Sequence, residues 1–102
     1  MTALRLVIAG RARLAILRIG AWWKANRLAA PSLFDEELAS AFKLIANTPA
    51  AGERWPSKKL PDVRRWLLKK TRYQVYYTVD DEGSTVTVRM VWYAGRGRGP
   101  KL

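Results

Sequence analysis

The stretch at residues 63–101 most constrains the fold of this chain, because three apolar runs within it alternate with a period of two residues. The runs cover residues 63–68, 72–79 and 84–93, and Asp-Asp-Glu-Gly at residues 80–83 forms a hairpin turn between the last two. This period is typical of strands that bury one face. We therefore predict three antiparallel strands. Lysines and arginines are interspersed among the apolar residues and follow them, so the predicted sheet is strongly basic.

The N-terminal half predicts one strand and two helices. Residues 4–8 alternate as a short strand, and an apolar stripe with helical spacing predicts a helix at residues 11–27. A second helix runs from Ser32 to about residue 47, where Thr48 and Pro49 end it. The two stripes consist of Ala12, Ile16, Ile19 and Trp23, and of Phe34, Leu38, Ala41 and Ile45. Helices joined so closely form an antiparallel hairpin, which we expect to cover one face of the sheet.

Acidic residues open the second helix. Ser32 and Asp35 have the spacing of a capping box, and Asp35, Glu36 and Glu37 lie where the helix dipole favours negative charge. This structural role is sufficient, so we assign these carboxylates no metal-binding or catalytic role.

These elements predict an α+β fold with the order β-α-α-β-β-β. In it, the N-terminal strand and the helical hairpin pack on a small twisted, mainly antiparallel sheet. A chain of 102 residues is long enough for a single domain, residues 1–102. Residues 50–61 contain a glycine and two prolines and predict a surface loop. The tail at residues 94–102 is rich in Gly and Arg without apolar periodicity, and we expect it to be extended or mobile.

A second apolar stripe lies on nearly the opposite side of the first helix. It consists of Leu14, Leu17, Ala21 and Leu28. A surface helix needs only one buried face. Either the neighbouring helix and loops cover the second stripe, or it forms a docking surface for a partner protein.

The charge balance points to an acidic or polyanionic partner. Lys and Arg number 19 against 8 Asp and Glu, a formal net charge of +11. Such a chain suits nucleic acid, a ribonucleoprotein or an acidic protein, and a plain solvated basic surface is the alternative. The sequence has no Cys and no His, which excludes thiolate and imidazole metal sites and a histidine base. We expect no metal and no cofactor.

No segment predicts export or membrane insertion. Arginines interrupt the apolar runs of the first 34 residues, and no apolar stretch is long enough to span a bilayer. We therefore expect a cytoplasmic protein.

Alternation along the strands divides the sheet into two faces. The face under the helices is expected to hold Trp66, Leu68, Val75, Tyr77, Val79, Val86, Val88, Met90 and Trp92. The outer face would carry Arg65, Leu67, Gln74, Tyr76, Thr78, Thr87, Arg89, Val91 and Tyr93. Aromatic rings that stack on bases, with guanidinium groups that pair with phosphates, suit nucleic acid or an acidic peptide. Ordinary cross-strand pairs on a solvated face are the alternative.

Six motifs occur in a fixed order along the chain. The first three are R-A-x-x-x-I-x-x-I-x-x-W-W at residues 11–23, N-R-x-A-A-P-x-L-F-x-x-E-L at residues 26–38 and P-x-x-G at residues 49–52. The others are R-R-x-L-L at residues 64–68, T-R-Y-x-V-Y-Y-x-V-D at residues 71–80 and V-W-x-A-x-R-G-R-G-P at residues 91–100. In order and spacing the chain resembles the RelE/ParE superfamily of type II toxin–antitoxin toxins, on its ParE-like branch.

The resemblance implies a small bacterial toxin that is neutralised by a cognate antitoxin. The C-terminal segment of such an antitoxin, often acidic or amphipathic, covers the helical hairpin and the sheet surface. Leu14, Leu17, Ala21 and Leu28 would then bind the antitoxin. No membrane and no small-molecule substrate is implied.

The resemblance leaves two activities open. RelE-like members cut messenger RNA on the ribosome, a reaction that needs a base and cations, whereas the described target of ParE-like members is DNA gyrase. Leu67, Gln74 and Ala94 stand near positions where RelE-like proteins carry basic residues, although Arg65 matches one. The resemblance therefore implies a non-enzymatic gyrase inhibitor, with a ribosome-dependent endoribonuclease as the alternative. A plain basic nucleic-acid-binding module is a third hypothesis.

The candidate site lies on the outer face under each hypothesis. Residues expected to bind the target or nucleic acid are Arg65, Lys69, Lys70, Arg72, Tyr76, Arg89, Tyr93, Arg96 and Arg98. Within this set the candidate catalytic residues of an endoribonuclease are Arg65, Arg89 and Tyr93.

Overall fold

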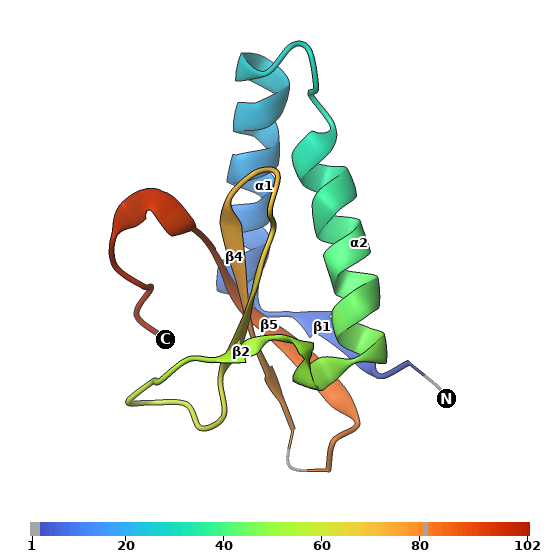
Figure 1. Ribbon diagram of the computed structural model, residues 1–102, viewed down its shortest axis with the longest axis vertical. Coiled ribbons are helices and arrows are strands. Elements are labelled where there is room, and N and C mark those ends of the chain that lie inside the picture. Colours follow the sequence, from blue (N-terminus) through green and yellow to red (C-terminus); the bar gives the residue numbers. More distant parts are fainter. Residues whose placement is uncertain (1–2, 81) are drawn as a thin grey trace.

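The computed structural model describes residues 3–80 and 82–102, which form a five-stranded sheet with two helices on one face (Figure 1). The elements are β1 (Arg5–Ile8), α1 (Gly10–Asn26), α2 (Leu33–Asn47), the 3-10 helix η1 (Pro49–Ala51), β2 (Glu53–Arg54), β3 (Arg64–Leu67), β4 (Tyr73–Val79), β5 (Thr85–Tyr93) and the 3-10 helix η2 (Ala94–Arg96). The sheet order is β1-β5-β4-β3-β2. β1 pairs with β5 in parallel, and the other neighbours are antiparallel. The predicted α+β fold is confirmed, with the short β2 added inside the predicted loop.

The core lies between the helices and one face of the sheet. The predicted stripe of α2 is fully buried, and in α1 Ala12 and Trp23 are buried while Ile16 and Ile19 pack partly buried beside them. The sheet contributes Leu68, Val75, Tyr77, Val86, Val88 and Val91. Both predicted helical stripes are thus confirmed, because burial of apolar side chains fixes which face of an amphipathic helix turns inward. Among the described residues, no helix is long and apolar enough to cross a membrane.

The predicted capping box at the start of α2 does not form. Ser32 makes no side-chain capping hydrogen bond, although its carbonyl oxygen accepts one from the amide of Glu36 at 2.9 Å. Asp35 instead forms an ion pair with Lys24 of α1 at 3.0 Å. Asp35 and Glu36 do lie in the first turn, so the dipole argument holds while the capping prediction is wrong.

Glu37 joins α2 to the turn between β3 and β4. Its carboxylate accepts hydrogen bonds from the amides of Lys70 at 2.8 Å and Thr71 at 3.0 Å, and from the Thr71 hydroxyl at 2.7 Å. These three hydrogen bonds to one carboxylate hold the β3–β4 hairpin against α2.

A β-bulge in β5 reverses the faces of its last residues. Tyr77 pairs with Val88 but Tyr76 pairs with Met90, so Arg89 is the extra residue. Beyond the bulge Val91 is buried in the core, whereas Met90 lies opposite Tyr76 on the outer face. The predicted outward placement of Val91 and inward placement of Met90 are therefore wrong.

The same bulge displaces the two aromatic residues that follow. Trp92 lies opposite Gln74 on the outer face, and Tyr93 lies opposite Tyr73 on the helix face. The Tyr73 and Tyr93 rings are 5.4 Å apart, and Tyr73 also meets Phe34 of α2 at 5.2 Å. Trp92 was expected inside and Tyr93 outside, and both expectations are wrong because strict alternation does not anticipate a bulge.

Tyr77 connects the core to the segment around η1. Its hydroxyl donates to the carbonyl of Pro49 at 2.7 Å and accepts from the amide of Gly52 at 2.9 Å. Burial disfavours the phenolate and raises the pKa of Tyr77, although the bond from Gly52 and the charge of Arg64 oppose this shift. A β-carbon on Gly52 would lie 2.5 Å from the Tyr77 hydroxyl oxygen, so only glycine fits there.

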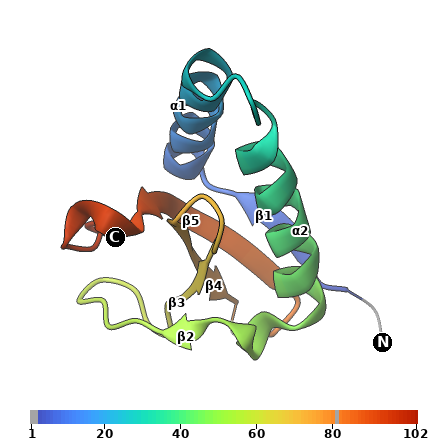
Figure 2. The same ribbon diagram turned by 45° about the horizontal axis from the view of Figure 1, so that its top comes forward.

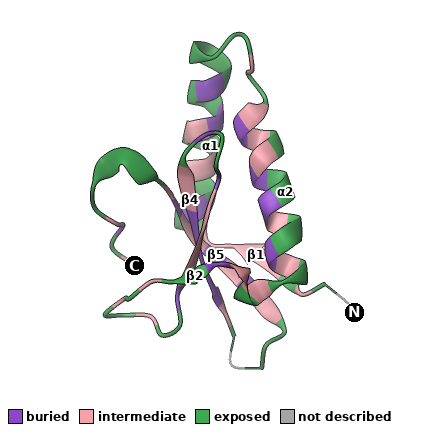
Figure 3. Cartoon of the chain, viewed as in Figure 1, coloured by how far each residue is buried: buried purple, intermediate pink, exposed green. Residues whose placement is uncertain are grey.

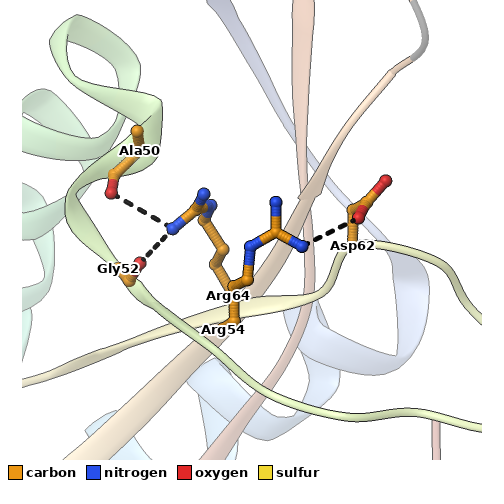
Figure 4. A network of polar contacts seen from close by, with 5 residues as sticks. All are labelled: Ala50, Gly52, Arg54, Asp62 and Arg64. Atoms are coloured by element: carbon orange, nitrogen blue, oxygen red, sulfur yellow. Dashed lines mark hydrogen bonds and ion pairs between the residues drawn. The ribbon is translucent and has the colours of Figure 1, made fainter.

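Two arginines hold the loop that carries β2 (Figure 4). Arg64 donates to the carbonyl oxygens of Gly52 at 2.7 Å and Ala50 at 3.3 Å. Arg54 forms an exposed ion pair with Asp62 at 3.5 Å. The predicted surface loop is thus attached to the sheet at its first half.

The hairpin between β4 and β5 is closed by Asp80. Its carboxylate accepts from the amides of Ser84 at 2.8 Å and Thr85 at 3.2 Å, and the bond from Ser84 lowers the pKa of the Asp80 carboxyl. Gly83 has φ +68°, which favours glycine. Asp81, also part of the predicted turn, lies outside the described residues.

Candidate functional site

The outer face of the sheet is partly covered, not open. Trp55, which follows β2, packs edge-on against Tyr76 with ring centroids 4.9 Å apart, and Tyr76 is only 1% exposed. Gly99 of the tail lies so close that a β-carbon there would be 2.3 Å from the Trp55 ring. We call this contact the Trp55–Gly99 clasp. The expected exposed aromatic surface is corrected accordingly, because Tyr76 is buried beneath the loop.

The tail folds back along the sheet, although we expected it to be extended or mobile. After η2, Gly97 has φ +76° and turns the chain. The indole Nε1 of Trp92 then donates to the carbonyl of Arg98 at 2.7 Å, and the Arg11 guanidinium donates to the carbonyl of Lys101. Figure 2 shows the tail and the loop after β2 beside each other at one end of the sheet.

A pocket of about 300 Å³ lies between the outer face and the tail. It is lined by Arg65, Gln74, Tyr76, Trp92, Tyr93, Ala94, Gly97, Arg98 and Gly99. Four predicted site residues, Arg65, Tyr76, Tyr93 and Arg98, thus contribute to the lining, although the ring of Tyr93 packs against Tyr73 on the helix face. We call it the outer-face pocket.

Arg65 and Gln74 set the polar character of the outer-face pocket. Partial burial works to lower the pKa of Arg65, but hydrogen bonding to Tyr76 and to the Glu53 carboxylate raises it overall, so Arg65 is a fixed cation. The amide oxygen of Gln74 is buried and accepts no hydrogen bond. A buried acceptor without a donor is uncommon in folded proteins.

The other predicted site residues lie elsewhere. Lys69, Lys70 and Arg72 belong to the β3–β4 turn and its exit, and Arg72 has φ +69°. Arg89 donates to the Thr78 hydroxyl at 3.0 Å beside the bulge. The Arg96 guanidinium lies over the Trp92 ring at 4.3 Å from its centroid. Arg96 therefore contacts a lining residue of the pocket without lining the pocket itself.

Sequence reasoning missed three residues that shape this site. Gln74 was placed on the outer face and noted for the charge that it lacks, but it was given no binding role, and Trp92 was assigned to the wrong face. Trp55 received no role. A tryptophan between Arg54 and Pro56 in a loop nevertheless indicates packing against a neighbouring surface, because its large apolar ring is favourably buried.

The outer-face pocket is equipped for binding more than for proton transfer. No lining residue is a carboxylate, and Glu53 nearby is engaged by Arg65. Among the residues that the structure describes, no cluster of His, Cys, Asp and Glu could hold a metal ion. Cations and aromatic rings remain, which attract anions and planar groups.

The second apolar stripe, which runs along α1 and continues to Leu28 in the turn after it, forms a separate exposed surface (Figure 3). Leu17 is 64% exposed and Leu28 82%, and Leu14 and Ala21 are exposed as well. Neither α2 nor any other described segment covers them, so the interpretation that they pack inside this chain is wrong. The adjoining Trp22 is also exposed and lies under the Arg27 guanidinium at 4.9 Å.

Several solved structures have the same fold. A chain of the RelBE2 toxin–antitoxin complex from Mycobacterium tuberculosis matches with a TM-score of 0.65 at 16% identity, over 90% of this chain and 99% of that one. A chain of the chromosomal ParDE system from P. aeruginosa matches with a TM-score of 0.65 at 16% identity, over 89% and 96%. A chain of the intact E. coli RelBE complex matches with a TM-score of 0.58 at 23% identity, over 92% and 100%. At these identities the likeness shows the fold alone.

The sequence itself distinguishes among families that share this fold. No curated protein matches it significantly. Residues 6–97, nearly the whole chain, match the family described as the ParE toxin of the type II toxin–antitoxin system parDE. The chain therefore belongs to the ParE toxin family of type II toxin–antitoxin systems.

Proposed function

We propose that this chain is a toxin that inhibits DNA gyrase by binding it, without catalysis, and that a cognate antitoxin neutralises it. Membership of the ParE family supports the toxin role. The observation that supports the non-enzymatic part is the composition of the outer-face pocket, whose lining includes Gln74 but no carboxylate and no histidine.

RNA cleavage would demand groups that this pocket does not offer. The 2′-hydroxyl must lose a proton to a base, and cations must stabilise the charge that develops on the phosphate. Among the lining residues only Tyr76 and Tyr93 carry a hydroxyl group that could serve as a base. Tyr76 is buried beneath Trp55, and Tyr93 pairs with Tyr73 on the helix face. This arrangement favours binding over cleavage.

The exposed stripe of α1 supports the antitoxin part of the proposal. Leu14, Leu17, Ala21 and Leu28 form an apolar strip, and arginines and lysine of the same helix border it. An amphipathic segment with acidic flanks complements such a surface. Solved relatives include chains from a RelBE2 complex and a ParDE system, and we infer the same kind of assembly here.

A supercoiling assay tests both parts together. Purified chain should inhibit gyrase, and an equimolar amount of the antitoxin encoded beside it should restore activity. Leu17→Asp should inhibit gyrase as strongly as the wild type but resist neutralisation, while Lys43→Ala, an exposed change on α2, should behave as the wild type. Full neutralisation of Leu17→Asp would contradict the assignment of the stripe to the antitoxin.

One observation favours a ribosome-dependent endoribonuclease as the second candidate. The outer-face pocket places Arg65 and Arg98 with Tyr93 in its lining. In that case Tyr93→Phe would abolish growth inhibition, because the phenol would be the base. A gyrase inhibitor predicts that Tyr93→Phe stays toxic and that translated messenger RNA stays uncut.

A further inference from the structure

We propose that a groove between the loop after β2 and the C-terminal tail binds an acidic segment of the target protein, one that carries a bulky apolar side chain. The groove is lined by residues 55–59 and 100–102, and we call it the loop–tail groove. The proposal rests on the proposed function, because gyrase is the target that supplies the segment. It adds a surface that contains none of the site residues predicted from the sequence.

Half of the residues that line the loop–tail groove are apolar, namely Trp55, Pro56, Pro100 and Leu102. The groove has a volume of about 400 Å³, within the range of sites that enclose small ligands. Pro100 is buried, and Trp55 and Leu102 are half-buried. A bulky apolar side chain placed against them would be removed from water together with the groove itself, which favours binding.

The charges of the groove select for carboxylates. Lys58, Lys59 and Lys101 are exposed lining residues, and the lining includes no acidic side chain. Among the residues that the structure describes, none of these three lysines forms an ion pair, whereas Asp62 at the end of the same loop is paired with Arg54. An acidic segment therefore complements the groove in charge, and a basic one is repelled.

Hydrogen bonds within the loop hold its side of the groove in place. The amide of Trp55 donates to the carbonyl of Val63 at 2.9 Å and closes the loop. The Ser57 hydroxyl oxygen accepts from the amides of Lys59 at 3.3 Å and Leu60 at 3.2 Å. The turn that carries the two adjacent lysines is thus shaped by the chain itself.

The tail side of the groove is attached at two points. The Arg11 guanidinium of α1 donates to the carbonyl of Lys101, and Gly99 lies against Trp55 in the clasp. Both sides are therefore positioned by contacts within the chain. Binding to a groove that is already formed orders few further groups, which preserves affinity.

The position of the groove assigns it to the target and not to the antitoxin. Gly99 lines the outer-face pocket and also contacts Trp55, so the groove and the pocket adjoin across the Trp55–Gly99 clasp. The loop after β2 lies on the side of the sheet away from the helical hairpin (Figure 2). The apolar stripe that we assign to the antitoxin runs along α1, so the two partners would contact different sides of the molecule.

Surface plasmon resonance of the purified full chain on immobilised gyrase holoenzyme, without DNA, tests the proposal. Lys58→Glu combined with Lys59→Glu should weaken gyrase binding about tenfold or more, because like charges then face the acidic segment. Leu102→Asn, which changes no charge, should weaken binding too. Both variants should keep the melting temperature of the wild type and bind the antitoxin as tightly as it does.

Arg5→Glu combined with Lys43→Glu is the matched control, because it makes the same change in charge at exposed positions of β1 and α2. It should bind gyrase nearly as tightly as the wild type. Equal losses in the two double variants would overturn the proposal in favour of unspecific attraction to a basic protein.

The remaining outcomes separate the partners. Unchanged gyrase binding by the Lys58→Glu, Lys59→Glu variant would overturn the proposal while the proposed function stands, whereas a wild-type chain that does not bind gyrase would overturn both. A loss of antitoxin binding in this variant as large as its loss of gyrase binding would assign the groove to the antitoxin and overturn the proposal. A loss that appears only when DNA is added would assign the groove to nucleic acid and overturn it as well.

Discussion

At the scale of single residues, Tyr77 shows how one side chain serves both the core and a loop. Its ring is fully buried among the apolar residues, and its hydroxyl holds two backbone groups of the segment after α2. Loss of the hydroxyl would leave the carbonyl of Pro49 and the amide of Gly52 without this hydrogen-bond partner. The residue therefore couples packing to loop position.

Tyr77→Phe should lower the free energy of unfolding by about 1–3 kcal/mol, because the amide of Gly52 and the carbonyl of Pro49 lose their partner. Urea denaturation measures the change. Tyr73→Phe is the control, since Tyr73 packs through its ring against Phe34 and Tyr93. An equal effect of the two substitutions would contradict the role of the Tyr77 hydroxyl.

The raised pKa of Tyr77 also predicts a dependence of stability on pH. Burial holds the proton on the folded phenol more tightly than in the unfolded chain, where the pKa is about 10. The contribution is therefore complete below pH ~10 and is lost as the pH rises through the folded-state value. Wild type should lose more stability than Tyr77→Phe between pH 9 and 11 (roughly the window around that reference value), and parallel curves would contradict the shift.

Gly99→Ala should open the Trp55–Gly99 clasp. A β-carbon 2.3 Å from the indole cannot be accommodated without movement of the tail or the ring. Hydrogen exchange at residues 94–102 should then accelerate, with little change in the melting temperature. Gly10→Ala is the control, because a β-carbon there meets nothing within 4 Å. Unchanged exchange in Gly99→Ala would show that the clasp does not hold the tail.

At the scale of elements, Glu37 forms a polar connection between the helical hairpin and the strands that bear the pocket, in addition to the apolar core. It receives three hydrogen bonds from the turn between β3 and β4. These strands also carry Arg65 and Gln74, so the position of α2 is coupled to the geometry of the outer-face pocket.

Glu37→Gln should destabilise the fold by about 1–2 kcal/mol, because the turn loses a charged acceptor and one of the two carboxylate oxygens. Thermal unfolding followed by circular dichroism measures it. Glu36→Gln, one residue earlier and exposed, removes the same charge and should cost less than ~0.5 kcal/mol. Comparable losses in both variants would attribute the effect to the helix dipole instead.

The elements also show where sequence reasoning succeeds and where it stops. The two helical stripes, the order of the helices and longer strands along the chain, and the inner positions Val75 and Val88 follow from periodicity. Burial of one face of an element places apolar residues at a regular spacing in the sequence. The bulge at Arg89 does not, because an extra residue on one strand leaves no local signature. Trp92 and Tyr93 were misplaced for that reason alone. The covering of Tyr76 by Trp55 is a contact between distant segments, which alternation cannot predict.

At the scale of the whole molecule, the chain presents two separate surfaces. The exposed stripe of α1 lies on the helical side, and the outer-face pocket lies beyond the opposite face of the sheet. A net charge of +11 favours fast association with acidic partners at both. Under the proposed function, neutralisation and target binding can be separated by substitution at the two surfaces.

The central claim is that the toxin acts on gyrase by binding and does not cut RNA. The most direct measurement places the wild-type chain in two parallel reactions. One contains gyrase, ATP and relaxed circular DNA, and the other is a translating extract mapped by primer extension. The account predicts that gyrase-dependent DNA cleavage complexes accumulate or supercoiling stops, while messenger RNA stays intact. Messenger RNA cut on the ribosome with gyrase unaffected would contradict it.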